Sequence, residues 1–167
     1  MALRNILTDE DPTLRKKSRE VVKFDDRLGE LIDDMKETLV AANGLGLAAP
    51  QVGVLRRLFV IIHEGEIMEF INPEIIEQEG AIEQAEGCLS LPGWSGIVTR
   101  PEKVKVRAFN RNGEEFTLEL EEIEARAICH ENDHLDGILY TDRSKEVYDN
   151  ESGDAIPDSR WKTHHID

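Results

Sequence analysis

The segment His130-Glu131-Asn132-Asp133-His134 constrains the fold of this chain more strongly than any other. On an α-helix, which repeats every 3.6 residues, two histidines four residues apart share a face and lie one turn from each other. On that face both imidazoles can bind one metal ion, and Glu131 can handle protons beside a water that the metal activates. The sequence therefore predicts a helix over this segment and a metal site that needs further ligands.

Cys88, in the sequence Glu86-Gly87-Cys88-Leu89-Ser90, is the candidate for a third ligand. A thiolate with two imidazoles leaves the fourth position of a tetrahedral site open for water, which is the arrangement of a catalytic metal. The alternative for Cys88 is a small buried side chain, the usual environment of a free cysteine.

The segment from Gly44 to Gly53 has the sequence GLGLAAPQVG, which is too rich in glycine for a helix interior. Small residues let a substrate backbone approach closely, and the side-chain amide of Gln51 can donate a hydrogen bond to a developing oxyanion. The segment lacks the Lys-Ser/Thr ending of a phosphate-binding loop. A tight turn is the alternative explanation for its composition.

Hydrophobic periodicity predicts an α+β fold. We expect sheets of short antiparallel or mixed strands packed around a central helix that carries His130 and His134. The expected helices span 12–17, 25–42 and 121–135, and the expected strands span 58–62, 67–71, 103–108 and 116–120. Short strands alternating with turns are expected over 72–101, and a polar, irregular and partly disordered tail over 141–167. The length of 167 residues predicts a single catalytic domain, 1–167.

Composition limits the partners of the chain. Its formal net charge of −15 argues against a broad nucleic-acid or anionic-membrane surface, because both would be repelled. Two cysteines cannot form a disulfide framework, and residues 1–11 lack the apolar core of a signal peptide. No apolar run has the length of a membrane span. We therefore expect a cytoplasmic protein.

Three segments, GLGLAAPQ (44–51), EGCLS (86–90) and HENDH (130–134), resemble the signature motifs of peptide deformylases in order and in spacing. Deformylases remove the formyl group from the N-terminal formyl-methionine of newly made proteins and release formate. The resemblance implies N-formylmethionyl peptides of nascent chains as substrates. It also implies one divalent metal ion, Fe²⁺ physiologically, with Zn²⁺, Ni²⁺ or Co²⁺ possible in preparations.

The same resemblance assigns roles to individual residues. It implies three metal ligands: Cys88, His130 and His134. Glu131 would carry the proton, and the Gln51 amide and the backbone N–H of Leu89 would stabilise the oxyanion. Four residues would bind the substrate: Leu45, Gly46, Leu91 and Ala127.

Neighbours of these residues carry further expectations. Arg126, one helical turn before the first histidine, is expected to cover the rim of the methionine pocket with its aliphatic stem. Glu86 and Arg100 form an ion pair, by hypothesis, that fixes the Cys88 loop. Cys129 replaces a glutamine that the family commonly has, and we expect it to be a buried structural thiol because its side chain points about 100° away from that of its neighbour.

Two other functions share part of this pattern. A zinc-dependent protease would usually recruit a third ligand downstream of His134, where the chain offers acids such as Asp136 without the extended signature. A non-enzymatic metal-binding module would require neither Glu131 nor Gln51. The acidic tail, 141–167, argues against docking on the ribosome through this segment, so we expect at most a weak ribosome association.

Overall fold

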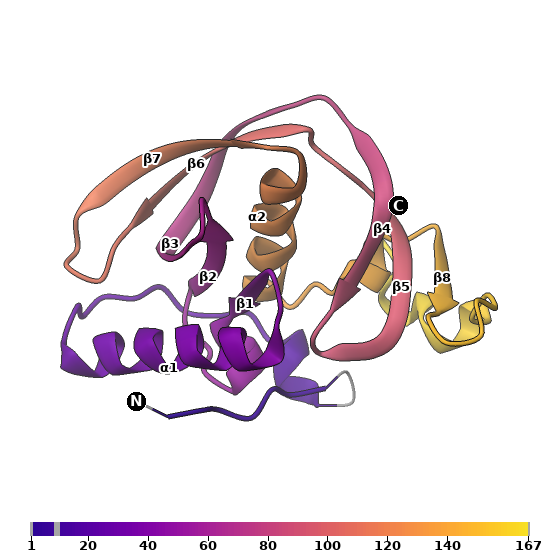
Figure 1. Cartoon of the computed structure of the whole chain (residues 1–167), viewed down its shortest axis with the longest axis horizontal. Helices are drawn as coiled ribbons and strands as arrows, with labels where there is room; N and C mark the ends of the chain where they lie inside the picture. Colours follow the sequence, from indigo (N-terminus) through magenta and orange to yellow (C-terminus); the bar gives the residue numbers. More distant parts are fainter. Residues whose placement is uncertain (1, 9–10, 167) are drawn as a thin grey trace.

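The computed structural model describes residues 2–8 and 11–166. The expected domain also contains residues 1, 9, 10 and 167, which lie outside the described residues. Helix α2 (Glu122–Leu135) lies at the centre of the molecule, between a five-stranded and a three-stranded sheet (Figure 1). All pairs of named strands are antiparallel. The predicted α+β class is confirmed.

Helix α1 (Asp26–Ala42) matches the predicted range to within one residue. The Asp25 side chain accepts a hydrogen bond from the backbone N–H of Leu28 at 3.1 Å and so caps the helix. The helix ends at Asn43, whose φ of 55° lies in the left-handed region. Its buried face packs on the five-stranded sheet through a set of apolar side chains: Leu28, Leu31, Ile32, Met35 and Leu39.

The five-stranded sheet has the order β1-β2-β3-β6-β7. Its strands are β1 (Gly46–Ala48), β2 (Leu58–His63), β3 (Glu66–Glu79), β6 (Lys103–Phe109) and β7 (Glu115–Glu121). The β2–β3 and β6–β7 hairpins confirm the four expected strands, with Val106 opposite Leu118. Most of the small-residue segment 44–53 has regular structure, as β1 and a 3-10 turn, η2 (Ala49–Val52).

Strand β3 is also longer than the sequence predicted. The expected break at Asn72-Pro73 is a shift of register between Ile71 and Glu74, after which pairing with β6 continues. Asn72 has a φ of 51°, and its side chain exchanges two hydrogen bonds with the backbone of Val21, at 2.8 and 2.9 Å. Turn-forming residues therefore make a bulge within one strand instead of ending it.

The three-stranded sheet has the order β4-β5-β8, with β4 (Ile82–Cys88), β5 (Leu91–Arg100) and β8 (Glu146–Asp149). Strand β8 pairs with β5, and Ile156 and Trp161 pack on Val147. The expectation of an irregular tail is therefore wrong for these residues. A strand with one buried apolar residue has no periodicity to detect, and its stability comes from the neighbouring strand.

Helix α2 contains both histidines of the motif. Its apolar face, including Ala125 and Ile128, packs against Phe59 and Phe70 of the five-stranded sheet. The helix ends at Leu135, as expected. Gly137, just beyond it, has a φ of +74°, and a Cβ there would lie 2.5 Å from the carbonyl oxygen of Arg15. Further 3-10 turns are η1 (Pro12–Arg15), η3 (Tyr140–Arg143), η4 (Asp158–Arg160) and η5 (Lys162–His164). Among the described residues, no helix is long and apolar enough to cross a membrane.

Candidate active site

Cys88, His130 and His134 bring one ligand atom each to within 4.8 Å of one another. Cys88 ends β4, and both histidines project from α2. The Cys88 Sγ lies 3.4 Å from the Nε2 of His134, whose side chain is almost fully buried. A thiolate and two imidazoles at this spacing fit a tetrahedral divalent ion with one position open, so the donor set present suits a catalytic metal.

Glu86 orients the first histidine. Its Oε1 lies 2.7 Å from the Nδ1 of His130, which leaves the Nε2 of the ring available to a metal. Burial alone would raise the pKa of the Glu86 carboxyl, but hydrogen bonds from His130 and Arg100 hold it far below its usual range. Glu86 is therefore a carboxylate, the form that accepts a proton-bearing nitrogen of a ligand histidine.

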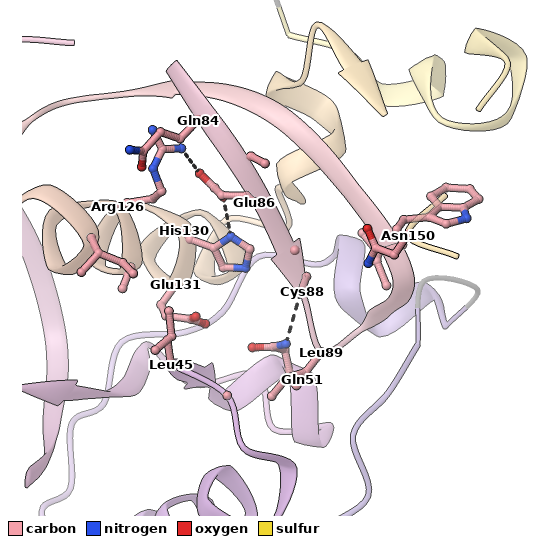
Figure 2. A pocket seen from close by; sticks show the side chains of 18 of the residues that line it. Leu45, Gln51, Gln84, Glu86, Cys88, Leu89, Arg126, His130, Glu131 and Asn150 are labelled. Atoms are coloured by element: carbon pink, nitrogen blue, oxygen red, sulfur yellow. Dashed lines mark hydrogen bonds and ion pairs between the residues drawn. The ribbon is translucent and has the colours of Figure 1, made fainter. Parts of the chain in front are cut away.

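A buried ionic network surrounds Glu86. Arg100 donates two hydrogen bonds to Glu86, at 2.8 and 3.0 Å, and one to Asp133 at 2.7 Å. Asp133 also accepts from Arg143 at 2.7 Å. The hypothesis of a Glu86–Arg100 pair is confirmed. The network joins the strand that carries Cys88 to the helix that carries both histidines. Figure 2 shows Glu86 of the strand in contact with His130 and Arg126 of the helix.

Arg126 belongs to the same network and, as expected, lines the cavity beside the ligand cluster, but its guanidinium is buried. The residue is 7% exposed, and its guanidinium donates to Glu86 at 2.6 Å. It also donates to the carbonyl oxygens of Val98 and Ile82, at 3.0 and 2.7 Å. The sequence showed only the helical position of Arg126; the carboxylate and carbonyls that surround its charge come from β4 and β5.

Glu131 is 4% exposed, and its Oε1 has no hydrogen-bond partner among the described residues. Burial raises the pKa of this carboxyl to about 7, although the nearby charge of His130 opposes the shift. A Cβ on Gly46 would lie 2.7 Å from the Oε2 of Glu131. The position of the carboxylate therefore requires a glycine in β1, which the small-residue pattern of the segment provides.

Gln51 is held by three contacts. Its Oε1 accepts from the backbone N–H of Ala48 at 2.9 Å, so its amide nitrogen points the other way. That nitrogen lies 3.6 Å from Cys88 Sγ and donates to the hydroxyl of Ser90 at 3.1 Å. Figure 2 shows the contact between Gln51 and Cys88. A fixed amide donor therefore lies beside the ligand cluster, and Ser90, which the sequence did not single out, helps to fix it.

A cavity of about 380 Å³ adjoins these residues. Among its lining are all predicted site residues except His134: Leu45, Gly46, Gln51, Cys88, Leu89, Leu91, Ala127, His130 and Glu131. His134 lies buried behind them. The lining also includes residues that sequence reasoning missed, among them Gln84, Trp94, Ile123 and Asn150. These carry no local signal, because they reach the cavity through strand pairing and helix packing.

Cys129 is 7% exposed and does not belong to the ligand cluster of the described residues. Burial raises the pKa of its thiol to about 11, so it is not a thiolate near neutral pH. The prediction of a buried thiol is confirmed.

Comparisons with known proteins agree with this geometry. A family model described as polypeptide deformylase matches residues 3–150. A peptide deformylase of Caldicellulosiruptor bescii is 60% identical over 144 residues, which cover 86% of each chain. One from Acetivibrio thermocellus is 57% identical over 143 residues, covering 86% of this chain and 84% of the relative.

Solved structures resemble the fold as well. The crystal structure of the Thermotoga maritima peptide deformylase has a TM-score of 0.84 and 41% identity, covering 86% of this chain and 98% of that one. The Legionella pneumophila peptide deformylase has a TM-score of 0.82 and 44% identity, covering 84% of this chain and 85% of that one. This chain therefore belongs to the peptide deformylase family of metal-dependent hydrolases, which remove the N-terminal formyl group of newly made proteins.

Proposed function

We propose that this chain hydrolyses the formyl group of N-formylmethionyl peptides at a single divalent metal ion held by Cys88, His130 and His134. The observation that carries the proposal is the convergence of this donor set with Glu131 and Gln51 on one cavity. The ion, when bound, lowers the pKa of a water molecule and polarises the formyl carbonyl.

Glu131 carries the proton in this proposal. As the water oxygen bonds to the formyl carbon, the Glu131 carboxylate accepts a proton from that water. When the bond between carbon and nitrogen breaks, Glu131 gives the proton to the leaving amine, and the products are formate and a free methionine N-terminus. Burial of the carboxyl and its unpartnered Oε1 support this role.

Gln51 and Leu89 stabilise the oxyanion that forms between these two steps. The amide nitrogen of Gln51 is fixed beside Cys88, and the N–H of Leu89 directly follows the cysteine. Donors held in place cost no reorganisation when charge develops. Four cavity residues bind the formyl-methionine in this proposal: Leu45, Gly46, Leu91 and Ala127.

We propose Fe²⁺ as the physiological ion. Membership of the family supports this choice, whereas donor chemistry alone would favour zinc, because a Cys-His-His set binds zinc more tightly by intrinsic preference. A thiolate site that holds Fe²⁺ is sensitive to oxygen. Anaerobic purification should therefore give iron and high activity, whereas preparation in air should lower the iron content and the activity together.

We further propose that residues 1–167 form one catalytic domain that acts in the cytoplasm on nascent chains. Pairing of β8 with β5, a strand that lines the cavity, supports inclusion of the C-terminal residues. Ribosome association is weak in this proposal and does not use the acidic tail.

Formate release from formyl-Met-Ala-Ser by anaerobically prepared protein tests the function. Glu131→Gln should lower kcat by about 10²- to 10⁴-fold, the usual contribution of a general base, while the metal content stays unchanged. Glu119→Gln, an exposed glutamate on β7, is the matched control and should keep wild-type activity. Cleavage of peptide bonds without formate would identify a protease, and bound metal with neither activity would identify a binding module.

A further inference from the structure

The C-terminal segment, residues 146–164, packs against β5, which forms one wall of the cavity. Its strand β8 places Asp149 opposite Trp94 of β5, and Trp94 lines the cavity. Beyond β8 the chain turns back and packs on this strand. Ile156 donates its N–H to the carbonyl of Val147 in β8 at 2.8 Å, and the indole N–H of Trp161 donates to the Ile156 carbonyl at 3.0 Å. The family match ends at residue 150, so most of this packing comes from residues outside it.

Asn150, the first residue after β8, is held in place by hydrogen bonds of both its backbone and its side chain. Its backbone N–H donates to the carbonyl of Gly93 at 2.8 Å, and its Oδ1 accepts from the Ser95 hydroxyl at 2.7 Å. The carboxylate of Asp149 accepts hydrogen bonds from the backbone N–H groups of residues 151 and 152, at 2.9 and 3.0 Å, and closes the turn that follows. The side-chain orientation of Asn150 is therefore set by the protein.

The amide nitrogen of Asn150 makes none of these contacts. Because its oxygen already accepts from Ser95, the nitrogen points away with two hydrogens, and no residue in the described part of the chain accepts a hydrogen bond from it. Asn150 is exposed and lines the same cavity as Cys88 and Glu131. In Figure 2 it lies on the opposite side of Cys88 from Leu45, where the proposed methionine pocket is.

We infer that Asn150 is a substrate-binding residue that donates a hydrogen bond to a backbone carbonyl of the formylated chain beyond its methionine. The inference rests on the proposed function, since it concerns the same cavity. Backbone carbonyls are present in every nascent chain, so this contact selects for chain length and not for sequence. The enzyme thereby favours polypeptides over small formyl-methionine derivatives.

Two substrates test the contact: formyl-Met-Ala-Ser and formyl-methionine N-methylamide, which has no residue after methionine. Asn150→Asp keeps an oxygen for the Ser95 hydroxyl and replaces the donor by an acceptor. The ratio of kcat/KM for the tripeptide to kcat/KM for the methylamide should fall about 3- to 10-fold, as expected for one hydrogen bond, and the change should lie in KM. Asn112→Asp, an exposed asparagine in the β6–β7 turn, adds the same charge far along the chain and should leave the ratio unchanged.

Asn150→Ala separates the lost donor from the added charge, and it should lower the ratio by a similar factor. The dissociation constant of the product Met-Ala-Ser, measured by calorimetry, should rise by the same factor in both variants. An unchanged ratio in Asn150→Ala, or an equal loss on both substrates, would overturn the inference. Failure of the wild-type protein to release formate from either substrate would instead refute the proposed function.

Discussion

Arg100 is the residue whose removal tests most directly how the ligand cluster is held together. Arg100→Leu keeps an apolar stem of similar reach but deletes the guanidinium, which makes three buried hydrogen bonds to Glu86 and Asp133. Glu86 keeps Arg126 at 2.6 Å, and Asp133 keeps Arg143 at 2.7 Å. Both carboxylates thus remain buried, and each keeps one arginine that offsets its charge.

The partners that Glu86 and Asp133 keep decide how much stability the variant loses. Breaking a buried ion pair from one side typically destabilises a protein by about 3–5 kcal/mol, because an uncompensated charge stays in the interior. Since neither carboxylate here loses all of its partners, we expect the lower end, about 3 kcal/mol. Glu86 also orients His130, and loss of a residue that orients a ligand typically weakens metal affinity by about 10- to 100-fold.

Urea unfolding of the metal-free protein measures the first effect, and competition with a chromogenic chelator measures the second. Metal-free protein is needed because a bound ion would add its own binding free energy to the stability. Arg107→Leu is the matched control: it removes an exposed guanidinium that contacts Glu74 at 2.6 Å and should cost less than about 1 kcal/mol, with metal affinity unchanged. An Arg100→Leu variant as stable as this control, with wild-type metal affinity, would refute the reasoning.

Three further predictions follow from the same geometry. Gly46→Ala should lower kcat by about 100-fold, because its Cβ would displace the Glu131 carboxylate 2.7 Å away; wild-type kcat would contradict the close approach. Burial alone would raise the pKa of Glu69, but hydrogen bonds from Lys36 and Arg111 lower it below its usual value. The contribution of Glu69 to stability is therefore complete above the unfolded pKa of about 4.3 and is lost as pH falls through the folded pKa. Urea unfolding should show wild type more stable than Glu69→Gln above the unfolded pKa, and this advantage should disappear as pH falls through the folded pKa. Removal of the metal by a chelator should lower the Tm, since the ion binds only the folded ligand cluster, and an equal Tm with and without chelator would argue against the site.

Elements with a strong local pattern were predictable from sequence. Helices α1 and α2 and the β6–β7 hairpin follow from hydrophobic periodicity, which acts over a few residues. The bulge at Asn72 and strand β8 were not predictable. Each exists because another segment supplies its hydrogen-bond partners: the backbone of Val21 bonds the Asn72 side chain, and β5 pairs with β8.

The candidate site divides in the same way. Its chemistry was visible in three short motifs, and the structure brings the candidate ligand atoms of Cys88, His130 and His134 to within 4.8 Å of one another. The burial of Arg126 and the presence of Asn150 at the cavity were invisible, because both depend on strands distant in sequence.

The sequence by itself therefore determined which chemistry this protein can perform, because donor types and helical spacing are local properties. Only the tertiary structure decided how the residues of the site are held in place and which residues surround the cavity beside them. It surrounds Glu86 with two arginines and a histidine, and it buries the Glu131 carboxylate against Gly46. It also carries Asn150 to the far wall of the cavity. These features arise from desolvation and strand pairing between distant segments, which no single stretch of sequence encodes.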